Sequence, residues 1–240
     1  MKMLAKGFLA LCLVLAGLTG YWAYLGYFGG ELFVPVPAER SVKPHHPGVA
    51  AVIVSGDMGF KVGMGPRIAA KLSADGIPVT GVNSLVYFRH RRTPAEIEQL
   101  IAAAVRRGLA FGHAQRVILI GQSFGADMVH VGLANLPPRL RSRIAMVALV
   151  VPTDSVNYKA SPAELFDLVP ADAPALPTAQ ALTWIPTFCV YDQEETDSLC
   201  PLLTASNVRK VALPGGHALH RDAEALYAQI ARAIDMSISR

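Results

Sequence analysis

The sequence predicts an α/β fold in which helices cover both faces of a mostly parallel β-sheet. Short runs rich in Val, Ile and Leu alternate with longer segments of helical periodicity along the chain after residue 48. The strand-like runs are apolar throughout, which is typical of strands buried on both faces. With 240 residues, of which 52% are hydrophobic and 17% charged, the chain is long and apolar enough to build such a core.

The alternation can be followed element by element. Predicted strands cover residues 49–55, 77–83, 117–120, 144–151, 187–191 and 208–213. Predicted helices cover residues 65–74, 94–107, 124–135 and 221–235. The helix at 94 has the clearest start, because Thr93 precedes Pro94 at the first position and Glu96 completes a near capping box. Strands and helices that alternate in this way favour a parallel sheet.

Residues 152–185 interrupt the alternation. The segment begins at Pro152, contains four further prolines at positions 162, 170, 174 and 177, and is too long for an ordinary connection between a strand and a helix. We expect a small cap over the carboxyl ends of the strands, where open parallel sheets bind their ligands.

The N-terminus has the features of an export signal. Lys2 and Lys6 precede an uncharged, apolar stretch, residues 7–30, which is long enough to cross a bilayer as a helix. Aromatic residues at its far end fit a membrane interface: Tyr21, Trp22, Tyr24, Tyr27 and Phe28. We expect residues 1–30 to form an uncleaved signal anchor in the inner membrane, with a cleaved signal peptide as the alternative. Residues 31–47, which contain four prolines, are predicted to link the anchor to a periplasmic domain of residues 48–240.

The cysteines and the charge agree with an exported protein. Apart from Cys12 in the leader, only Cys189 and Cys200 remain, and an even pair in an oxidising compartment favours a disulfide over two unrelated thiols. The net charge of +4 suits an anionic membrane surface but is too small and too scattered to indicate nucleic acid. The densest basic cluster, residues 89–92, is expected to be a solvated loop. Nothing in the sequence calls for a cofactor or a metal ion.

The segment 121–125 (GQSFG) carries the strongest chemical signal. It directly follows a predicted strand and opens a predicted helix, the setting of a nucleophile elbow, in which flanking side chains would collide with backbone. The helix N-terminus adds a partial positive charge and free N–H groups. We therefore predict an α/β-hydrolase fold, a mostly parallel sheet flanked by helices with a small cap insertion, and Ser123 as its nucleophile.

A serine hydroxyl needs a base, and in this fold the chain order is Ser, then acid, then His. His217 follows a Pro-Gly-Gly turn after the last predicted strand and is the preferred base, with His220 as the alternative. His130 lies on the helix after the elbow and is expected to be a packing or surface residue. The acid is expected in the loop after the strand 187–191, where Asp197 is slightly favoured over Glu195 because it lies nearer Cys200.

The oxyanion hole needs two N–H donors. The backbone N–H of Phe124 is the first, because it follows the nucleophile at the start of a helix. The second is expected from the loop after the first core strand, where the N–H of Asp57 or of Met58 is the candidate. The side chain of Asp57 could otherwise cap the next turn.

Taken together, these segments resemble the VirJ/AcvB family of bacterial virulence proteins. The resemblance covers the exported domain and rests on VSGDMG, GVNSLVYFRHRRTP, VILIGQSFGAD, LPPRLR, YDQEETDSLCP and LPGGHALH. Ser123, His217 and the two cysteines match the family's serine, histidine and cysteine pair, while Glu195 and Asp197 both match acidic positions. The chain departs from the family pattern at Met58 (usually Gly), Asn83 (Asp) and Ala218 (a second His).

The resemblance implies a periplasmic hydrolase that acts on a membrane phospholipid. AcvB-type members release lysine from lysyl-phosphatidylglycerol, and VirJ-type members are associated with type IV secretion of virulence factors. We therefore expect a serine hydrolase at the membrane surface that cleaves the aminoacyl ester of this lipid. Two alternatives stay open: an accessory protein that binds secretion-system components, and a generic esterase or lipase.

Overall fold

A mostly parallel sheet of seven strands forms the centre of the domain, as the sequence predicts. The computed structural model describes residues 2–160 and 169–238. The strand order is β1-β3-β2-β4-β5-β8-β9, and only the β1–β3 pair is antiparallel. The strands span Phe33–Val36 (β1), Val49–Val54 (β2), Val79–Val82 (β3), Arg116–Gln122 (β4), Ile144–Val150 (β5), Thr187–Tyr191 (β8) and Val208–Ala212 (β9).

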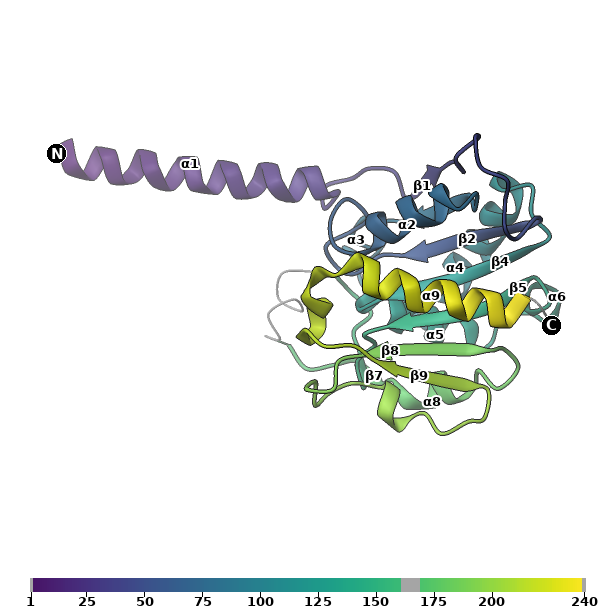
Figure 1. Cartoon of the computed structure of the whole chain (residues 1–240). Coiled ribbons are helices and arrows are strands. Elements are labelled where there is room, and N and C mark those ends of the chain that lie inside the picture. The colour runs from purple at the N-terminus through teal and green to yellow at the C-terminus, as the bar shows by residue number, and fades with distance from the viewer. Residues whose placement is uncertain (1, 161–168, 239–240) are drawn as a thin grey trace.

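Helices cover both faces of this sheet (Figure 1). Gly65–Ala74 (α2) and Ala223–Ile238 (α9) pack on one face, and Pro94–Phe111 (α4) and Phe124–Leu133 (α5) pack on the other. In β2, Val52 and Val54 belong to the core under α4 and α5, whereas Ala51 and Ile53 belong to the core under α2 and α9. Because both sets are apolar, the strand reads as a continuous hydrophobic run.

The helix boundaries follow from local chemistry. The capping box at α4 is complete, since the Thr93 hydroxyl accepts from the Glu96 amide and a Glu96 carboxylate oxygen accepts from the Thr93 amide. Two short helices that the sequence analysis leaves out, Ser84–Phe88 (α3) and Pro138–Arg141 (α6), lie in connections. Their few residues carry too little periodicity to be recognised.

The segment predicted as a linker, residues 31–47, instead packs on the domain. Its residues Phe33–Val36 form the antiparallel edge strand β1 beside β3. Farther along, the Ser73 hydroxyl donates to the Pro37 carbonyl at 2.6 Å, and His46 Nε2 lies 2.9 Å from a carboxylate oxygen of Asp235. Proline is tolerated here because an edge strand leaves some of its N–H positions unpaired.

The insertion at 152–185 falls in part on residues 161–168, which lie outside the described residues. Its described part contains the short antiparallel pair Ser155–Val156 (β6) and Ala173–Pro174 (β7), followed by Leu176–Gln180 (α8). The predicted cap therefore has defined structure on either side of the gap.

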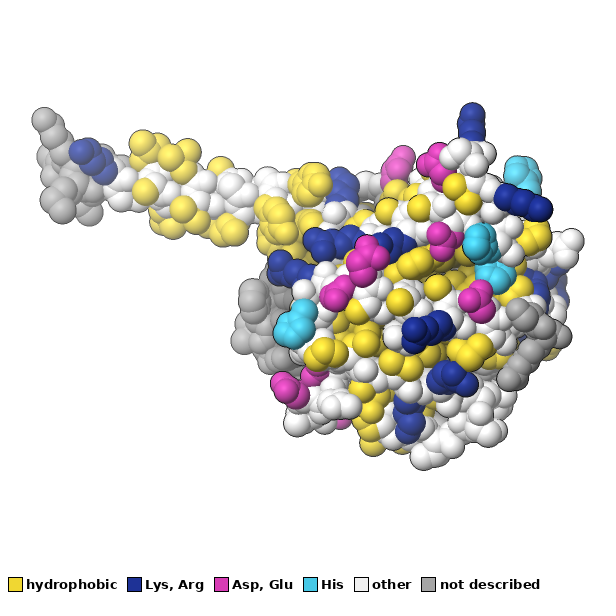
Figure 2. All heavy atoms as spheres, viewed as in Figure 1, with side chains coloured by type: hydrophobic (Ala, Val, Ile, Leu, Met, Phe, Trp, Pro, Cys, Tyr) yellow, Lys and Arg dark blue, Asp and Glu magenta, His cyan; other side chains and the backbone are white. Residues whose placement is uncertain are grey.

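A long helix, Lys2–Leu25 (α1), projects from the domain (Figure 1). Its residues Lys6–Leu25 are long and apolar enough to cross a membrane, and the space-filling view shows apolar side chains along it (Figure 2). The helix leaves the molecule on the side toward which the parallel strands run. Cys12 on this helix is exposed and free.

Candidate active site

Ser123 occupies a sharp turn between β4 and α5. Its backbone has φ 51° and ψ −128°, a conformation that side-chain-bearing residues rarely adopt. The flanking glycines are required by space: a Cβ on Gly121 would lie 2.5 Å from the Gly125 carbonyl oxygen, and a Cβ on Gly125 would lie 2.2 Å from the Val54 carbonyl oxygen. This geometry is that of a nucleophile elbow.

His217 and Glu195 complete a hydrogen-bonded row with Ser123. Ser123 Oγ lies 2.7 Å from His217 Nε2, and His217 Nδ1 lies 2.5 Å from Glu195 Oε1. The order Ser–His–acid is that of a catalytic triad. The structure thus places Glu195, not the slightly favoured Asp197, against the imidazole.

The three side chains meet because their loops follow parallel strands of one sheet, β4, β8 and β9, with only β5 between β4 and β8. Ser123 follows β4, Glu195 follows β8 and His217 follows β9, so all three lie at the carboxyl edge of the sheet. Before His217 the chain turns through Gly215 and Gly216, whose φ values are 118° and 62°. The alternative base, His220, is exposed on the same turn, beyond the row.

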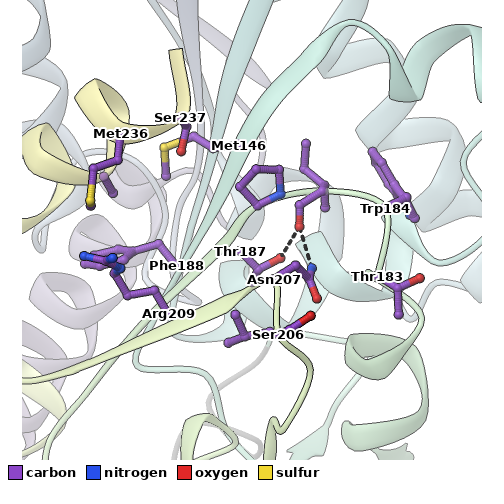
Figure 3. A pocket seen from close by; sticks show the side chains of 14 residues that line it. Met146, Thr183, Trp184, Thr187, Phe188, Ser206, Asn207, Arg209, Met236 and Ser237 are labelled. Carbon is purple, nitrogen blue, oxygen red and sulfur yellow. Dashed lines mark hydrogen bonds between the residues drawn. The ribbon is translucent and has the colours of Figure 1, made fainter. Parts of the chain in front are cut away.

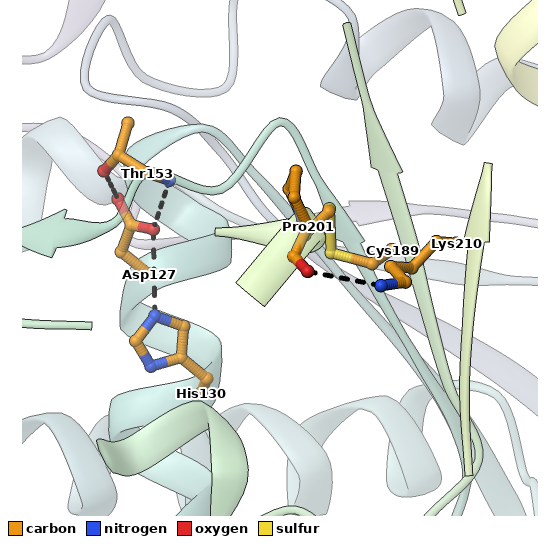
Figure 4. The surroundings of a disulfide bond; sticks show 7 residues. Asp127, His130, Thr153, Cys189, Pro201 and Lys210 are labelled. Carbon is orange, nitrogen blue, oxygen red and sulfur yellow. Dashed lines mark hydrogen bonds and ion pairs between the residues drawn. A yellow bond between two sulfur atoms is a disulfide. The ribbon is translucent and has the colours of Figure 1, made fainter. Parts of the chain in front are cut away.

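The Glu195 loop is closed by a disulfide between Cys189 on β8 and Cys200, with Cα atoms 5.7 Å apart (Figure 4). This pairing confirms the prediction from cysteine usage. Asp197 lies in the same loop, where its carbonyl accepts from the Asp154 amide at 2.7 Å. Asp197 therefore fastens the loop to the insertion through its backbone rather than through its side chain.

The two candidate oxyanion donors differ in their surroundings. Phe124 is the first residue of α5, and the first N–H groups of a helix have no acceptor within the helix. In the turn 56–59, the carboxylate of Asp57 lies near the backbone amides of Asp57 and Met58. Burial raises the pKa of this carboxyl, and the Met58 amide and the nearby His217 partly counter that effect.

A cavity of about 360 Å³ opens over Ser123 and His217. Its described lining is mostly polar: Asp57, Ser123, Phe124, Asp127, Thr153, Ser155, Asn157, Lys159, Ala160, Glu195, Asp197 and His217. The described lining contains four carboxyl groups and one lysine, so acidic side chains outnumber lysines there. Such a lining suits a polar, cationic group better than a long hydrocarbon chain.

Asp127 and His130 join the elbow helix to the insertion, a connection that the sequence analysis missed. Asp127 accepts bonds from the amide of Thr153 at 3.1 Å and from its hydroxyl at 3.0 Å (Figure 4). His130 Nδ1 lies 2.8 Å from Thr178 Oγ1, and Nε2 lies 3.8 Å from Asp127. Burial raises the pKa of Asp127, and His130 and Thr153 only partly offset it. The i, i+3 spacing of the two side chains on a buried helix is the signal that could have found the pair.

Another cavity, of about 480 Å³ (Figure 3), shares no lining residue with the cavity over Ser123. It is bordered by residues that begin β8 and β9, including Thr187 and Val208, and by Met236 near the end of α9. The amino ends of the parallel strands form this edge, opposite to Ser123. Within residues 2–160 and 169–238, no group of three or more His, Cys, Asp or Glu side chains is arranged to hold a metal ion.

The sheet, the elbow on β4 and the Ser–His–acid row at the carboxyl edge define an α/β-hydrolase fold. The model of the family described as bacterial virulence protein (VirJ) matches residues 48–238, and the chain belongs to this family. No curated protein matches the sequence.

Solved structures confirm the fold. The ferulic-acid-bound Est1E from Butyrivibrio proteoclasticus is 13% identical with a TM-score of 0.61, and the match covers 87% of this chain and 95% of that one. A putative thioesterase from Silicibacter is 20% identical with a TM-score of 0.57, over 86% and 83% of the two chains. Proline iminopeptidase from Mycobacterium smegmatis is 14% identical with a TM-score of 0.57, over 86% and 94%.

Proposed function

We propose that this protein is a serine hydrolase that cleaves a carboxylic ester through a covalent acyl-enzyme. The observation that carries the proposal is the hydrogen-bonded row Ser123–His217–Glu195 on a nucleophile elbow. His217 Nε2 takes the proton of Ser123 as its oxygen attacks the carbonyl carbon, and Glu195 stabilises the imidazolium that forms. The Phe124 amide binds the oxyanion.

The second half of the reaction uses the same groups in reverse. The imidazolium of His217 gives its proton to the departing alcohol oxygen, which leaves Ser123 esterified by the acyl group. Water then loses a proton to His217, attacks the ester carbon and releases the acid, and the proton returns to Ser123 Oγ. Each step needs only a proton acceptor or donor within reach of Oγ, and Nε2 at 2.7 Å meets that need.

The proposed substrate is an aminoacyl ester of a membrane phospholipid, with lysyl-phosphatidylglycerol as the preferred case. In an aminoacyl ester the ammonium is on the carbon next to the reacting carbonyl, so it must lie within a few ångströms of Ser123. Asp57, which lines the cavity and interacts electrostatically with His217, is the carboxylate that we assign to this ammonium. The family resemblance and the apolar helix α1 support a lipid substrate on the periplasmic side of the membrane.

Turnover of defined lipids by the full-length protein in detergent or vesicles tests the proposal. We expect release of lysine and phosphatidylglycerol from lysyl-phosphatidylglycerol, measured by mass spectrometry, and loss of activity by about 10⁵–10⁶-fold in Ser123→Ala. A parallel assay with a short-chain neutral ester separates the aminoacyl specificity from generic esterase activity.

Two results would reject parts of the proposal. Equal rates for wild type and Ser123→Ala would reject the enzyme and favour an accessory protein of the secretion apparatus. Hydrolysis of the neutral ester without any effect on the aminoacylated lipid would keep the serine hydrolase and reject the substrate.

A further inference from the structure

The C-terminal end of α1 is part of the hydrolase domain. Leu25 is fully buried in the core that also contains Val82, Leu85 and Phe88. An anchor that only tethers a domain would end in solvent. Here, loss of the helix would expose an apolar site in the core, which favours a retained anchor over a cleaved signal peptide.

A specific cap holds this helix end in place. The Gly26 amide donates to the Ala23 carbonyl at 3.1 Å, and the Tyr27 amide donates to the Trp22 carbonyl at 2.9 Å. Together with Gly26 at φ 108°, these bonds form a Schellman motif. The rings of Trp22 and Tyr27 meet edge to face at 5.4 Å, which supplies the hydrophobic contact of that motif, and both pack against the core.

The capped end contacts the loops that support the active site. The Asn83 side-chain amide donates to the Leu25 carbonyl at 3.3 Å at the end of β3. A Cβ on Gly59, in the loop after β2 that carries Asp57, would lie 3.1 Å from the same carbonyl oxygen. Lys61 donates to the Tyr24 carbonyl at 2.6 Å. The helix is therefore fastened to the same carboxyl edge of the sheet at which Ser123 lies.

The helix is only as long as a bilayer is thick, so no helical turn is left over to separate the domain from the membrane. The 20 residues Lys6–Leu25 span about 30 Å at 1.5 Å per residue, which equals the hydrocarbon thickness of a typical membrane. Since Leu25 is buried in the domain, the helix can cross only if the docking face of the domain reaches the headgroup layer. Tyr21, Tyr24 and Phe28 are 45%, 56% and 63% exposed around that junction, where aromatic side chains favour the interface.

We propose that α1 is a membrane-spanning helix docked rigidly on the domain, and that it holds the carboxyl edge of the sheet, where Ser123 lies, against the bilayer surface. Figure 1 shows the helix leaving the domain on the side toward which the parallel strands run, and Figure 2 shows Lys and Arg side chains around its base, where anionic headgroups would lie. Ester groups in the headgroup layer then enter the cavity over Ser123 directly. This orientation rests on the proposed function only in taking a lipid ester as the substrate.

Fluorescence energy transfer from a dye on the domain to acceptors in the bilayer tests the orientation and does not depend on catalytic activity. In a Cys12→Ser background of the full chain, Gln193→Cys places a dye on the exposed loop after β8, and Ser206→Cys places one on the exposed loop before β9. Because β8 and β9 are parallel neighbours, the dyes are separated along the strand direction by about 17 Å, five residues at about 3.3 Å each. The protein is reconstituted in vesicles of phosphatidylglycerol and phosphatidylcholine that carry a headgroup-linked acceptor in both leaflets.

We expect at least about twofold stronger transfer from position 193 than from position 206. Equal transfer from the two positions, as a flexible tether gives, or stronger transfer from position 206 would overturn the proposal. An enzyme that fails to hydrolyse lipid but keeps the unequal transfer would reject the proposed function and leave the orientation intact.

A pair of variants at one position tests the role of the docked helix end. Leu25→Asp places a charge in the core, and undocking of the helix end relieves its burial, so the ratio of the two transfers should fall toward one. Leu25→Met keeps the volume and should keep the parent ratio. A Leu25→Asp protein that folds and retains the unequal transfer would show that this contact does not set the orientation. If that variant fails to fold, the comparison of positions 193 and 206 in the parent still decides.

Discussion

His217 Nδ1 lies 2.5 Å from Glu195 Oε1, while Nε2 on the other side of the ring faces Ser123 Oγ at 2.7 Å. The carboxylate therefore fixes which nitrogen carries the proton and leaves the other free to accept one from the serine. The side chain of Glu195 is only 14% exposed, so water competes little for this bond. Among several nearby carboxylates, Glu195 is thus the one that the structure places in contact with the imidazole.

Substitution of Glu195 tests that assignment. We expect Glu195→Gln to lower kcat by about 10³–10⁴-fold, because the amide can stabilise neither the correct tautomer nor the imidazolium. The matched control is Asp197→Asn, a carboxylate two residues along the same loop, which should change kcat by no more than about threefold. Steady-state hydrolysis of a short-chain ester by both variants measures the difference. A larger loss in Asp197→Asn than in Glu195→Gln would reverse the assignment.

The sequence was sufficient to place Ser123 in an elbow turn but not to choose which carboxylate contacts His217, and the reason is physical. Ser123 lies in a local turn whose glycines, strand and helix are all contiguous in the chain. The choice between Glu195 and Asp197 depends on contacts from distant segments: the position of the His217 imidazole and the bond from the Asp154 amide to the Asp197 carbonyl. No local pattern encodes such contacts.

The same distinction explains the segment 31–47. Its prolines predict an extended conformation, and Phe33–Val36 is indeed extended. Whether an extended segment stays free or joins a sheet depends on an available strand edge, which here is supplied by β3, more than forty residues away. The docking of Leu25 was hidden for a similar reason, since its burial depends on α3 and on the end of β3.

The position of Asp57 in the lining of the cavity leads to a prediction about substrate selectivity. If its carboxylate binds the ammonium of an aminoacyl ester, Asp57→Asn should raise KM for that ester by about tenfold and leave KM for a neutral ester nearly unchanged, because only a charge-assisted bond is lost. Asp154→Asn, an exposed carboxylate outside the lining of the cavity, is the control. Equal changes in KM for the two substrates would remove Asp57 from ammonium binding.

The burial of the Asp57 carboxyl also leads to a prediction about the pH dependence of stability. Burial raises the pKa of Asp57 above its ordinary value of 3.8, so the folded protein binds this proton more tightly than the unfolded chain does. The tighter proton binding stabilises the folded state at low pH. This contribution to the free energy of unfolding is lost as pH rises from about 3.8 through the raised pKa. Asp57→Asn removes the penalty, and its Tm should exceed that of wild type at pH 7 by more than it does at pH 4. Thermal unfolding of both proteins at the two pH values provides the comparison, and an advantage confined to pH 4 would contradict it.

The disulfide is expected to contribute to both stability and catalysis. The cysteines are separated by 11 positions, and closure of a loop of that size stabilises by about 2–3 kcal/mol. Replacing both cysteines by alanine should lower the free energy of unfolding by that amount and also lower kcat, since the loop that holds Glu195 is no longer closed. Cys12→Ala, which changes the free thiol on α1, should alter neither quantity. Denaturant unfolding and ester hydrolysis measure the two effects, and unchanged kcat in the double variant would show that the loop is held by its other contacts.

The last prediction concerns Gly125, one of the two glycines that flank Ser123 in the elbow. A Cβ at Gly125 would lie 2.2 Å from the Val54 carbonyl and 2.4 Å from the Ser55 carbonyl, both of them backbone atoms that cannot move aside. Gly125→Ala must therefore displace the start of α5 from β2, at a cost of about 3 kcal/mol or more, and must move Ser123 away from His217. Gly56→Ala is the matched control in the same site, because its Cβ would have 3.6 Å to the Gln122 carbonyl oxygen, an ordinary contact. We expect Gly125→Ala to lose both stability and activity and Gly56→Ala to unfold near the wild-type midpoint. If the two variants unfold alike, the close approach of α5 to β2 does not require glycine.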